Sequence, residues 1–185
     1  MKTLIGIPLF ALALSVHAET TDLFTGAFSV ANWTVSLQGG VVNLSAAPLS
    51  GLLVSADDDS GPSEQSLTIG ATSYGLVSFG WTYESDDIAP VFDAFGYTVN
   101  GLFFPVSVDT DPLLQAGSTS FAVAAGDIFG FSQQSFDSSG GAARTTVGSF
   151  RFEALPPPIP EPGAAALLLL GLPVVWALRQ RRSHA

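Results

Sequence analysis

Cysteine is absent from this chain of 185 residues, and its two histidines, His17 and His184, lie near the ends. Lysine occurs once, at Lys2, so residues 19–155 contain no cysteine, histidine or lysine. Catalytic triads and cysteine–histidine pairs need an imidazole base, and Schiff-base enzymes need a lysine amine. Zinc sites ordinarily use thiolate or imidazole ligands. The central part of the chain therefore lacks the side chains for these enzymes and metal sites.

Positive charge is equally scarce in this central part. Fifteen acidic residues stand there against only Arg144 and Arg151, which gives residues 19–155 a formal charge of −13. Such a surface repels nucleic acids and anionic lipid headgroups, and it favours cations and neutral sugars. No glycine-rich nucleotide-binding motif stands between a strand and a helix. We expect no nucleic-acid partner, no enzymatic activity and no cofactor apart from the calcium considered below.

The first eighteen residues have the three parts of a secretory signal peptide. A short basic start is followed by an apolar run, Leu4–Val16, and by small residues at Val16 and Ala18. This order is typical of a segment that directs export through the Sec translocon and is cleaved off, here after Ala18. We expect residues 1–18 to be removed; the alternative is a retained membrane anchor.

A second apolar run lies at the other end of the chain. It begins with Pro160, Glu161 and Pro162, continues through the sixteen uncharged residues Gly163–Leu178, and ends in a basic segment, residues 179–185. The basic segment carries Arg179, Arg181 and Arg182. As an α-helix, the apolar part would span ~24 Å of the ~30 Å bilayer core, and arginine snorkelling and local bilayer thinning would close the gap. The arginines favour the cytoplasmic side of the inner membrane, so we expect the preceding chain to face outward.

The order of Pro160-Glu161-Pro162, an apolar helix and a terminal arginine cluster resembles the PEP-CTERM sorting signal of Gram-negative bacteria. This resemblance implies processing at the motif by exosortase, a membrane-embedded enzyme similar to cysteine transpeptidases. It also implies transient anchoring with the domain in the periplasm, followed by transfer to the cell surface or extracellular matrix. The stretch Phe79–Gly101 resembles segments of small exported PEP-CTERM proteins, which favours a β-sandwich and adds no functional site.

Residues 19–155 are long enough for one domain with its own core, and the proline-rich residues 156–159 form a stiff linker to the tail. The domain is rich in glycine, serine, threonine, valine and phenylalanine, and no apolar period of 3.6 residues appears before the tail. Short alternating segments separated by turns predict an all-β fold, a single antiparallel β-sandwich of jelly-roll type. The alternative architecture is an immunoglobulin-like sandwich.

Alternation of apolar and polar residues places individual strands. The clearest are Leu76–Glu84 and Arg144–Glu153, each with large apolar side chains on one face only. A further strand is predicted at Phe24–Ala31. Asn100-Gly101 predicts a type I′ turn joining Phe95–Val99 to the following strand, because both central residues of that turn need positive φ.

Calcium is the metal that this composition permits, since calcium binds six to eight hard oxygen ligands on loops. Acidic residues gather at Asp57–Asp59, around Glu84 to Asp93, and at Asp109 and Asp111. None of these clusters has the spacing of an EF-hand loop. If calcium binds, we expect Asp86, Asp87 and Asp93 to be the ligands. The alternative is that these are solvated loops that discourage edge-to-edge pairing of strands.

The aromatic residues Trp33, Trp81, Tyr83 and Tyr97 allow two interpretations, carbohydrate stacking or core filling. Core filling is favoured, because Trp81 and Tyr83 alternate in phase with apolar residues of the same strand. The main hypothesis is thus an exported, exosortase-processed surface or matrix protein with a non-catalytic β-sandwich. The alternative is a carbohydrate-binding module, calcium-dependent or not, that associates with exopolysaccharide. A small hydrolase that uses two carboxylates is a third hypothesis.

Overall fold

The computed structural model describes residues 20–109 and 112–156. The predicted signal peptide, the Pro-Glu-Pro motif, the predicted membrane helix, the basic end and nearly all of the linker lie outside the described residues. Among the residues that are described, no helix is both long enough and apolar enough to cross a membrane.

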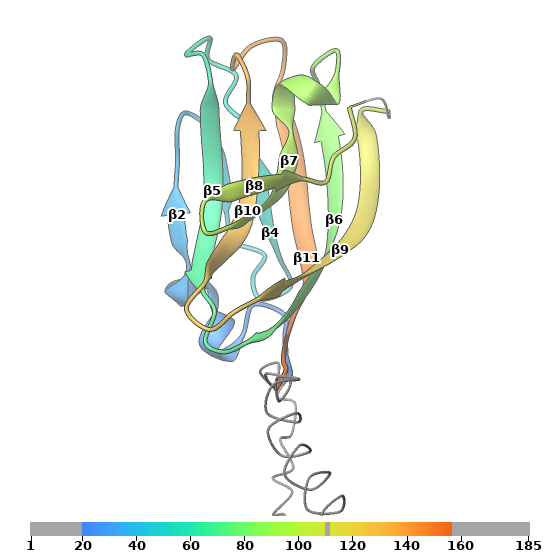
Figure 1. Cartoon of the computed structure of the whole chain (residues 1–185). Helices are drawn as coiled ribbons and strands as arrows, with labels where there is room; N and C mark the ends of the chain where they lie inside the picture. Colours follow the sequence, from blue (N-terminus) through green and yellow to red (C-terminus); the bar gives the residue numbers. More distant parts are fainter. Residues whose placement is uncertain (1–19, 110–111, 157–185) are drawn as a thin grey trace, which may run out of the picture.

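Two antiparallel sheets stack face to face (Figure 1). The first has the order β3 (Val41–Asn43), β4 (Ser50–Val54), β11 (Ala143–Ala154), β6 (Gly75–Ser85) and β9 (Leu114–Val123), and β1 (Thr20–Asp22) also pairs with β11. The second has the order β2 (Thr34–Ser36), β5 (Ser63–Gly70), β10 (Ile128–Ser135), β7 (Phe95–Val99) and β8 (Leu102–Pro105). The predicted all-β, antiparallel two-sheet architecture is confirmed.

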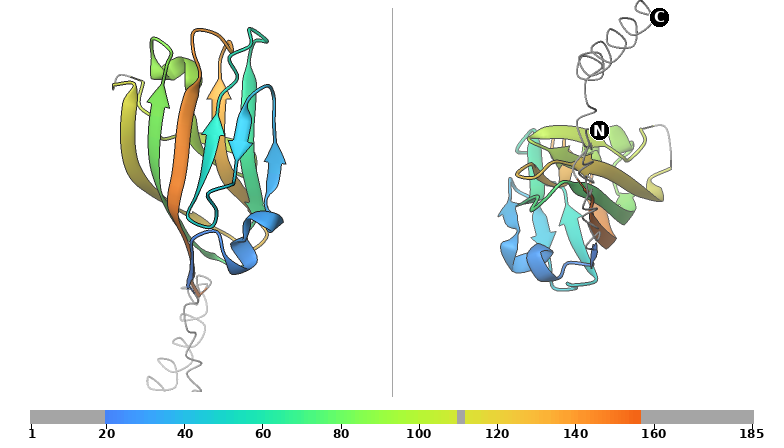
Figure 2. Two further views of the ribbon diagram at one scale, coloured as in Figure 1. Left: turned by 180° about the vertical axis from the view of Figure 1, so that it is seen from behind. Right: turned by 60° about the horizontal axis from the view of Figure 1, so that its bottom comes forward.

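The first and last strands of the described chain lie side by side at one end of the sandwich. Thr20 pairs with Glu153, and the last residues of β11 lie at the lower end of the molecule in Figure 1. The short 3-10 helix η3 (Pro90–Asp93) lies at the opposite end, as both views from the side show (Figures 1 and 2). The paired residues Thr20 and Glu153 and the helix η3 therefore lie at opposite ends of the sandwich.

Strand β6 follows the predicted alternation. Val77, Phe79 and Tyr83 are buried between the sheets, whereas Thr82 and Glu84 are exposed. The strand lies between β11 and β9, with hydrogen-bonded partners on both sides. Its apolar face is therefore the centre of the core contributed by the first sheet.

Strand β11 contains a β-bulge that the sequence pattern did not reveal. Its register with β6 shifts between Gly148 and Arg151, and Ser149 has a φ of 50°. Before the bulge the buried side chains are at odd positions, ending with Val147; after it they are Phe150 and Phe152. The extra residue switches which positions face inward. The predicted common face of Phe150 and Phe152 is confirmed, but only for the second half of the strand.

The predicted hairpin at Asn100-Gly101 is confirmed. Val99 pairs with Leu102, and the two central residues have φ values of 51° and 80°. The Asn100 side chain also fixes the start of β10, because its Oδ1 accepts a hydrogen bond from the Ile128 amide at 2.9 Å. The turn therefore joins β7 to β8 and also anchors the neighbouring strand.

The predicted strand Phe24–Ala31 is wrong. This segment forms two 3-10 helices, η1 (Gly26–Phe28) and η2 (Val30–Asn32), below the sandwich in Figure 1. Phe24 and Phe28 are both buried, and the chain turns between them at Gly26, whose φ of 55° is incompatible with a continuous strand. The two rings close the lower end of the core, so burial of apolar rings there outweighed the local preference for extended backbone.

Candidate functional site

A groove of about 370 Å³ opens at the end of the sandwich that carries η3. It lies between the first residues of β5, the last residues of β10 and the η3 segment, with one further residue contributed by the loop after β2. Its walls are Gln38, Pro62, Ser63, Glu64, Val91, Phe92, Ala94, Gln134, Ser135 and Phe136. The groove therefore lies at the end of the sandwich opposite the paired residues Thr20 and Glu153.

Backbone hydrogen bonds fix the walls of this groove to one another. The Gln134 amide donates to the Ala94 carbonyl at 2.9 Å, and the Phe136 amide donates to the Phe92 carbonyl at 2.7 Å. On the other wall, the Glu64 amide donates to the Gln38 Oε1 atom at 3.2 Å. These bonds join β10 to η3 and β5 to the loop after β2. Because a preformed site loses little entropy on binding, such walls favour a ligand site.

The groove combines polar planar groups with aromatic rings. Gln38 and Gln134 supply amides, which both donate and accept hydrogen bonds, and Glu64 supplies a carboxylate, which accepts them. Phe92 and Phe136 supply rings whose centroids are 6.5 Å apart, with an angle of 55° between their planes. Phe136 is 69% exposed, an unusual state for a phenylalanine. The combination suits a ligand that presents both an apolar face and several hydroxyl groups.

The groove does not present paired carboxylates. Glu64 is the one acidic side chain among its described lining residues, and its Oε1 atom already accepts a hydrogen bond from Ser132 Oγ at 2.7 Å. Glycoside hydrolysis ordinarily needs two carboxyl groups that face each other across the bond to be cut. The arrangement is therefore suited to binding rather than to hydrolysis.

The four aromatic residues singled out from the sequence lie elsewhere. Trp33 and Tyr83 are buried, and Trp81 and Tyr97 are partly buried and pack against the core. Tyr97 stacks on Phe121 with ring centroids 4.1 Å apart. The core-filling interpretation of these residues is confirmed, and none of them lines the groove.

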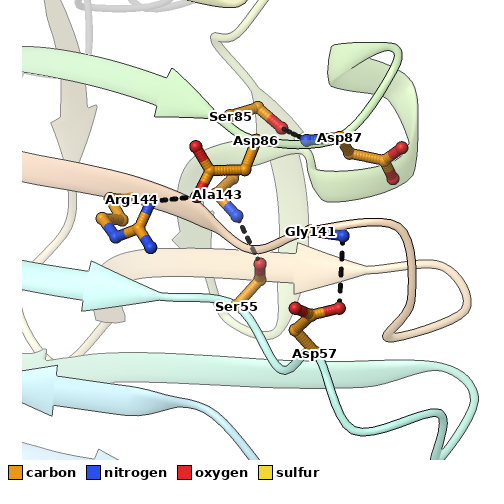
Figure 3. Close-up of polar contacts among 8 residues, drawn as sticks. All are labelled: Ser55, Asp57, Ser85, Asp86, Asp87, Gly141, Ala143 and Arg144. Atoms are coloured by element: carbon orange, nitrogen blue, oxygen red, sulfur yellow. Dashed lines mark hydrogen bonds and ion pairs between the residues drawn. The ribbon is translucent and has the colours of Figure 1, made fainter.

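The acidic loops meet near the same end of the sandwich, but their side chains point in different directions. Asp86 points toward Arg144, with 2.5 Å between its Oδ2 and the Arg144 Nη1 atom, and Asp87 points away from both (Figure 3). Asp57 lies on the loop between β4 and β5, where its Oδ1 atom accepts a hydrogen bond from the Gly141 amide at 3.2 Å. Asp86 and Asp57 are exposed, whereas Asp87 is buried.

Asp93, the last residue of η3, is buried inside the sandwich, with 1% of its surface exposed. Neither of its carboxylate oxygens has a hydrogen-bond partner. Burial raises the pKa of Asp93 from its ordinary value of 3.8 to about 6. The hydroxyls of Ser55 and Ser135 lie close enough to lower this pKa in part, although neither has hydrogen-bonding geometry, and the charges of Asp87 and Asp137 raise it.

The structure does not gather Asp86, Asp87 and Asp93 into one set of metal ligands. No group of three or more acidic side chains within residues 20–109 and 112–156 is placed to hold a metal ion together. Asp86 is occupied by Arg144 on the surface, whereas Asp87 and Asp93 are buried. The predicted trio is therefore not assembled, because Asp86 and Asp87 lie in the bend after β6 and their side chains point in different directions (Figure 3).

The groove residues were not singled out from the sequence, although a signal for one of them exists. The large buried side chains of β10, Phe129, Phe131 and Gln133, lie at odd positions, and the even positions between them hold the small residues Gly130 and Ser132. Phe136 has the opposite parity and follows Gln134, so a large aromatic ring on the outward face could have been predicted. Phe92 carried no comparable signal, because its direction depends on the course of the loop after β6.

Comparisons with known proteins place this chain in no family. No protein-family model matches it, and no curated protein matches it. Among solved structures it is similar to a family 29 carbohydrate-binding module from Piromyces equi, at 14% identity and a TM-score of 0.41, over 76% of this chain and 93% of that one.

Two further solved structures are similar to the same extent. A family 35 carbohydrate-binding module from Clostridium thermocellum matches at 12% identity and a TM-score of 0.40, over 74% of this chain and 99% of that one. A family 61 module in complex with β-1,4-galactotriose matches at 14% identity and a TM-score of 0.41, over 66% of this chain and 88% of that one. At such low identities and TM-scores, the function of this chain has to be argued from its own residues.

Proposed function

We propose that this chain is an exported surface or extracellular-matrix protein whose non-catalytic β-sandwich binds polysaccharide in the groove beside η3. The observation that carries the proposal is the exposed ring of Phe136 beside Phe92, in a groove that is also lined by Gln38, Glu64 and Gln134. A sugar ring has an apolar face of C–H groups and an edge of hydroxyls. Such a ligand needs an aromatic platform and planar hydrogen-bonding groups together.

The negative charge of the domain indicates which class of polysaccharide can bind in the groove. Glu64 is the charged residue of the described groove walls, and residues 19–155 carry a formal charge of −13. A polysaccharide with uronate, sulfate or phosphate groups would be repelled by this surface. The expected ligand is therefore a neutral polysaccharide. The alternation of successive strands β4 to β7 between the two sheets favours the jelly-roll connection, which is common among lectin domains.

Substitutions in the groove test this proposal. Replacing Phe136 or Gln134 by alanine is expected to weaken binding of a neutral polysaccharide by roughly 5- to 20-fold, because the first removes the exposed ring of the groove and the second removes one of its hydrogen-bonding amides. The measurement is affinity electrophoresis of the full-length protein in detergent, through gels that contain one of a panel of neutral and acidic polysaccharides.

Leu114→Ala is the matched control, because Leu114 is 70% exposed on β9, outside the groove. It should leave the retardation by polysaccharide unchanged. If the wild-type protein migrates equally with and without every polysaccharide of the panel, or if the control and the groove variants weaken binding alike, the groove is not a polysaccharide site.

We further propose that the two chain ends determine where the domain acts. The support is the signal peptide up to Ala18 and the tail that combines Pro160-Glu161-Pro162 with an apolar run and arginines. The Sec translocon would export the chain, exosortase would process it at the inner membrane, and the domain would reach the cell surface or matrix. A groove at the end of the sandwich opposite Glu153 would then face away from the point where the tail begins.

Mass spectrometry of the protein released from the cell surface tests this sorting proposal. We expect a mature N-terminus at Glu19 and a C-terminus within Pro160-Glu161-Pro162, with or without a covalent attachment. In cells that lack the processing enzyme, the tail should remain. A surface protein that retains both ends, or the same tail-bearing length in both strains, would contradict the proposal.

A further inference from the structure

Asp93 is the strongest anomaly in the described part of the molecule. Its carboxylate is buried, and neither oxygen has a hydrogen-bond partner. Burying an ionised carboxylate without a partner is costly, so such a group normally pairs with a cation or keeps a proton. The backbone around it is well held, because Gln133 Nε2 donates to the Asp93 carbonyl at 2.7 Å. The side chain is therefore presented to the interior by a fixed loop.

Asp87 and Tyr83 are also buried near this end of the sandwich, and the Asp87 Oδ1 atom accepts a hydrogen bond from the Ile88 amide. Asp87 is 4% exposed, and its carboxylate lies against Gly140, where a Cβ atom would stand only 2.8 Å from Oδ1. The φ of Gly140 is 85°, so glycine is required there for two reasons. The hydroxyl of Tyr83 is also buried without a hydrogen-bond partner. The nearby charges of Asp93 and Asp87 contribute to the raised pKa of Tyr83, whose main cause is burial.

No basic side chain of the described domain is available to neutralise this site. Arg144 pairs with Asp86 on the surface. Arg151 lies 3.7 Å from Asp22 and 3.9 Å from Glu153, also on the surface. Residues 19–155 contain no lysine and no histidine. A cation that neutralises Asp93 must therefore come from solution.

We propose that Asp87 and Asp93 hold a calcium ion inside the end of the sandwich, with the neighbouring hydroxyls of Ser55 and Ser135 as neutral oxygen donors. A site with two carboxylates and several neutral oxygens matches the oxygen preference of calcium. The site differs from the set expected from the sequence, because Asp86 is excluded and two serines from distant strands are included.

The proposed ion would join three separate segments. Ser55 follows β4, Asp93 ends η3, and Ser135 ends β10. Phe92, Ala94 and Ser135 also line the groove. The ion would therefore hold the groove wall in place, but its binding does not depend on what the groove recognises.

The test is calcium titration of the full-length protein in detergent, after removal of metals with EDTA and dialysis at about pH 7.5. Isothermal calorimetry should show one site with a Kd of about 0.1 to 1 mM, the range of extracellular calcium modules. Excess calcium should raise the melting temperature by several degrees, and magnesium should do so much less. Asp93→Asn should abolish both responses, and the matched surface variant Asp86→Asn should keep both.

Absence of heat and of any melting shift for the wild-type protein in excess calcium would overturn the proposal. So would loss of the response in Asp86→Asn together with its retention in Asp93→Asn. If Asp93→Asn does not fold, the wild-type calorimetry decides whether calcium binds and Asp87→Asn decides where it binds. Because these readouts contain no sugar, a failed groove would leave the cation result unchanged.

Discussion

Phe150→Ala is expected to lower the free energy of unfolding by about 3 to 5 kcal/mol, which for a domain of this size is a large part of the total. Phe150 is 1% exposed and follows directly on the bulge of β11. Its ring centroid lies 5.1 Å from that of Phe24, 5.6 Å from that of Phe28 and 5.6 Å from that of Trp33. Truncation would leave a cavity between the two sheets that these stiff aromatic neighbours cannot fill.

Urea unfolding followed by tryptophan fluorescence measures this loss. Phe136→Ala is the matched control, because it removes the same ring from a position that is 69% exposed. The control should change the stability by less than about 0.5 kcal/mol. Equal losses for the two variants would mean that Phe150 is not the centre of the core or that Phe136 is not on the surface.

The second large effect concerns Asp93 and pH. In the presence of EDTA, Asp93→Asn is expected to be more stable than the wild-type protein by about 2 to 3 kcal/mol at neutral pH, because the substitution removes an unpartnered buried charge. The folded pKa of Asp93, about 6, lies above the unfolded value of 3.8. The folded state therefore binds the proton more tightly. The contribution of the protonated carboxyl to stability is fully present below about pH 4 and is lost as the pH rises through 6.

The measurement is the difference in unfolding free energy between wild type and Asp93→Asn across this pH range. The difference should be small near pH 4 and should grow to its full value above about pH 6. The groups near Asp93 are Asp87, Asp137, Tyr83 and the hydroxyls of Ser55 and Ser135, all present in both proteins. Asp86→Asn, which breaks an exposed ion pair, should cost less than about 1 kcal/mol. A difference that does not vary with pH would show that Asp93 titrates normally.

The strands that could be predicted are those whose pattern is local. In β6, alternation of Val77, Phe79 and Tyr83 with polar residues records burial on one face, and the structure agrees. Asn100-Gly101 fixes a turn through its own φ preferences. The segment from Phe24 to Asn32 failed because its rings fill the lower end of the core, a requirement set by residues far away in the sequence. The bulge in β11 was missed because one extra residue leaves no mark on composition.

For the acidic residues, too, the sequence predicted some features and only the packing of distant segments decided the others. The sequence placed Asp86, Asp87 and Asp93 near one another along the chain, but spacing could not tell which carboxylates are buried. Asp86 lies on the surface beside Arg144, and Asp93 lies inside without a partner. Desolvation depends on what other segments cover a side chain, so the raised pKa of Asp93 follows only from packing.

By itself, the sequence determined the residue types available: a strongly acidic central part without cysteine, histidine or lysine, and short alternating segments that form antiparallel strands. The proposed export and sorting also rest on the sequence alone, because the predicted signal peptide and the C-terminal tail lie outside the described residues. Only the tertiary structure decided where the groove forms and which carboxylate is buried. Both depend on β5, β10 and η3 meeting at one end of the sandwich, and contacts between segments so far apart in the chain leave no local periodicity to read.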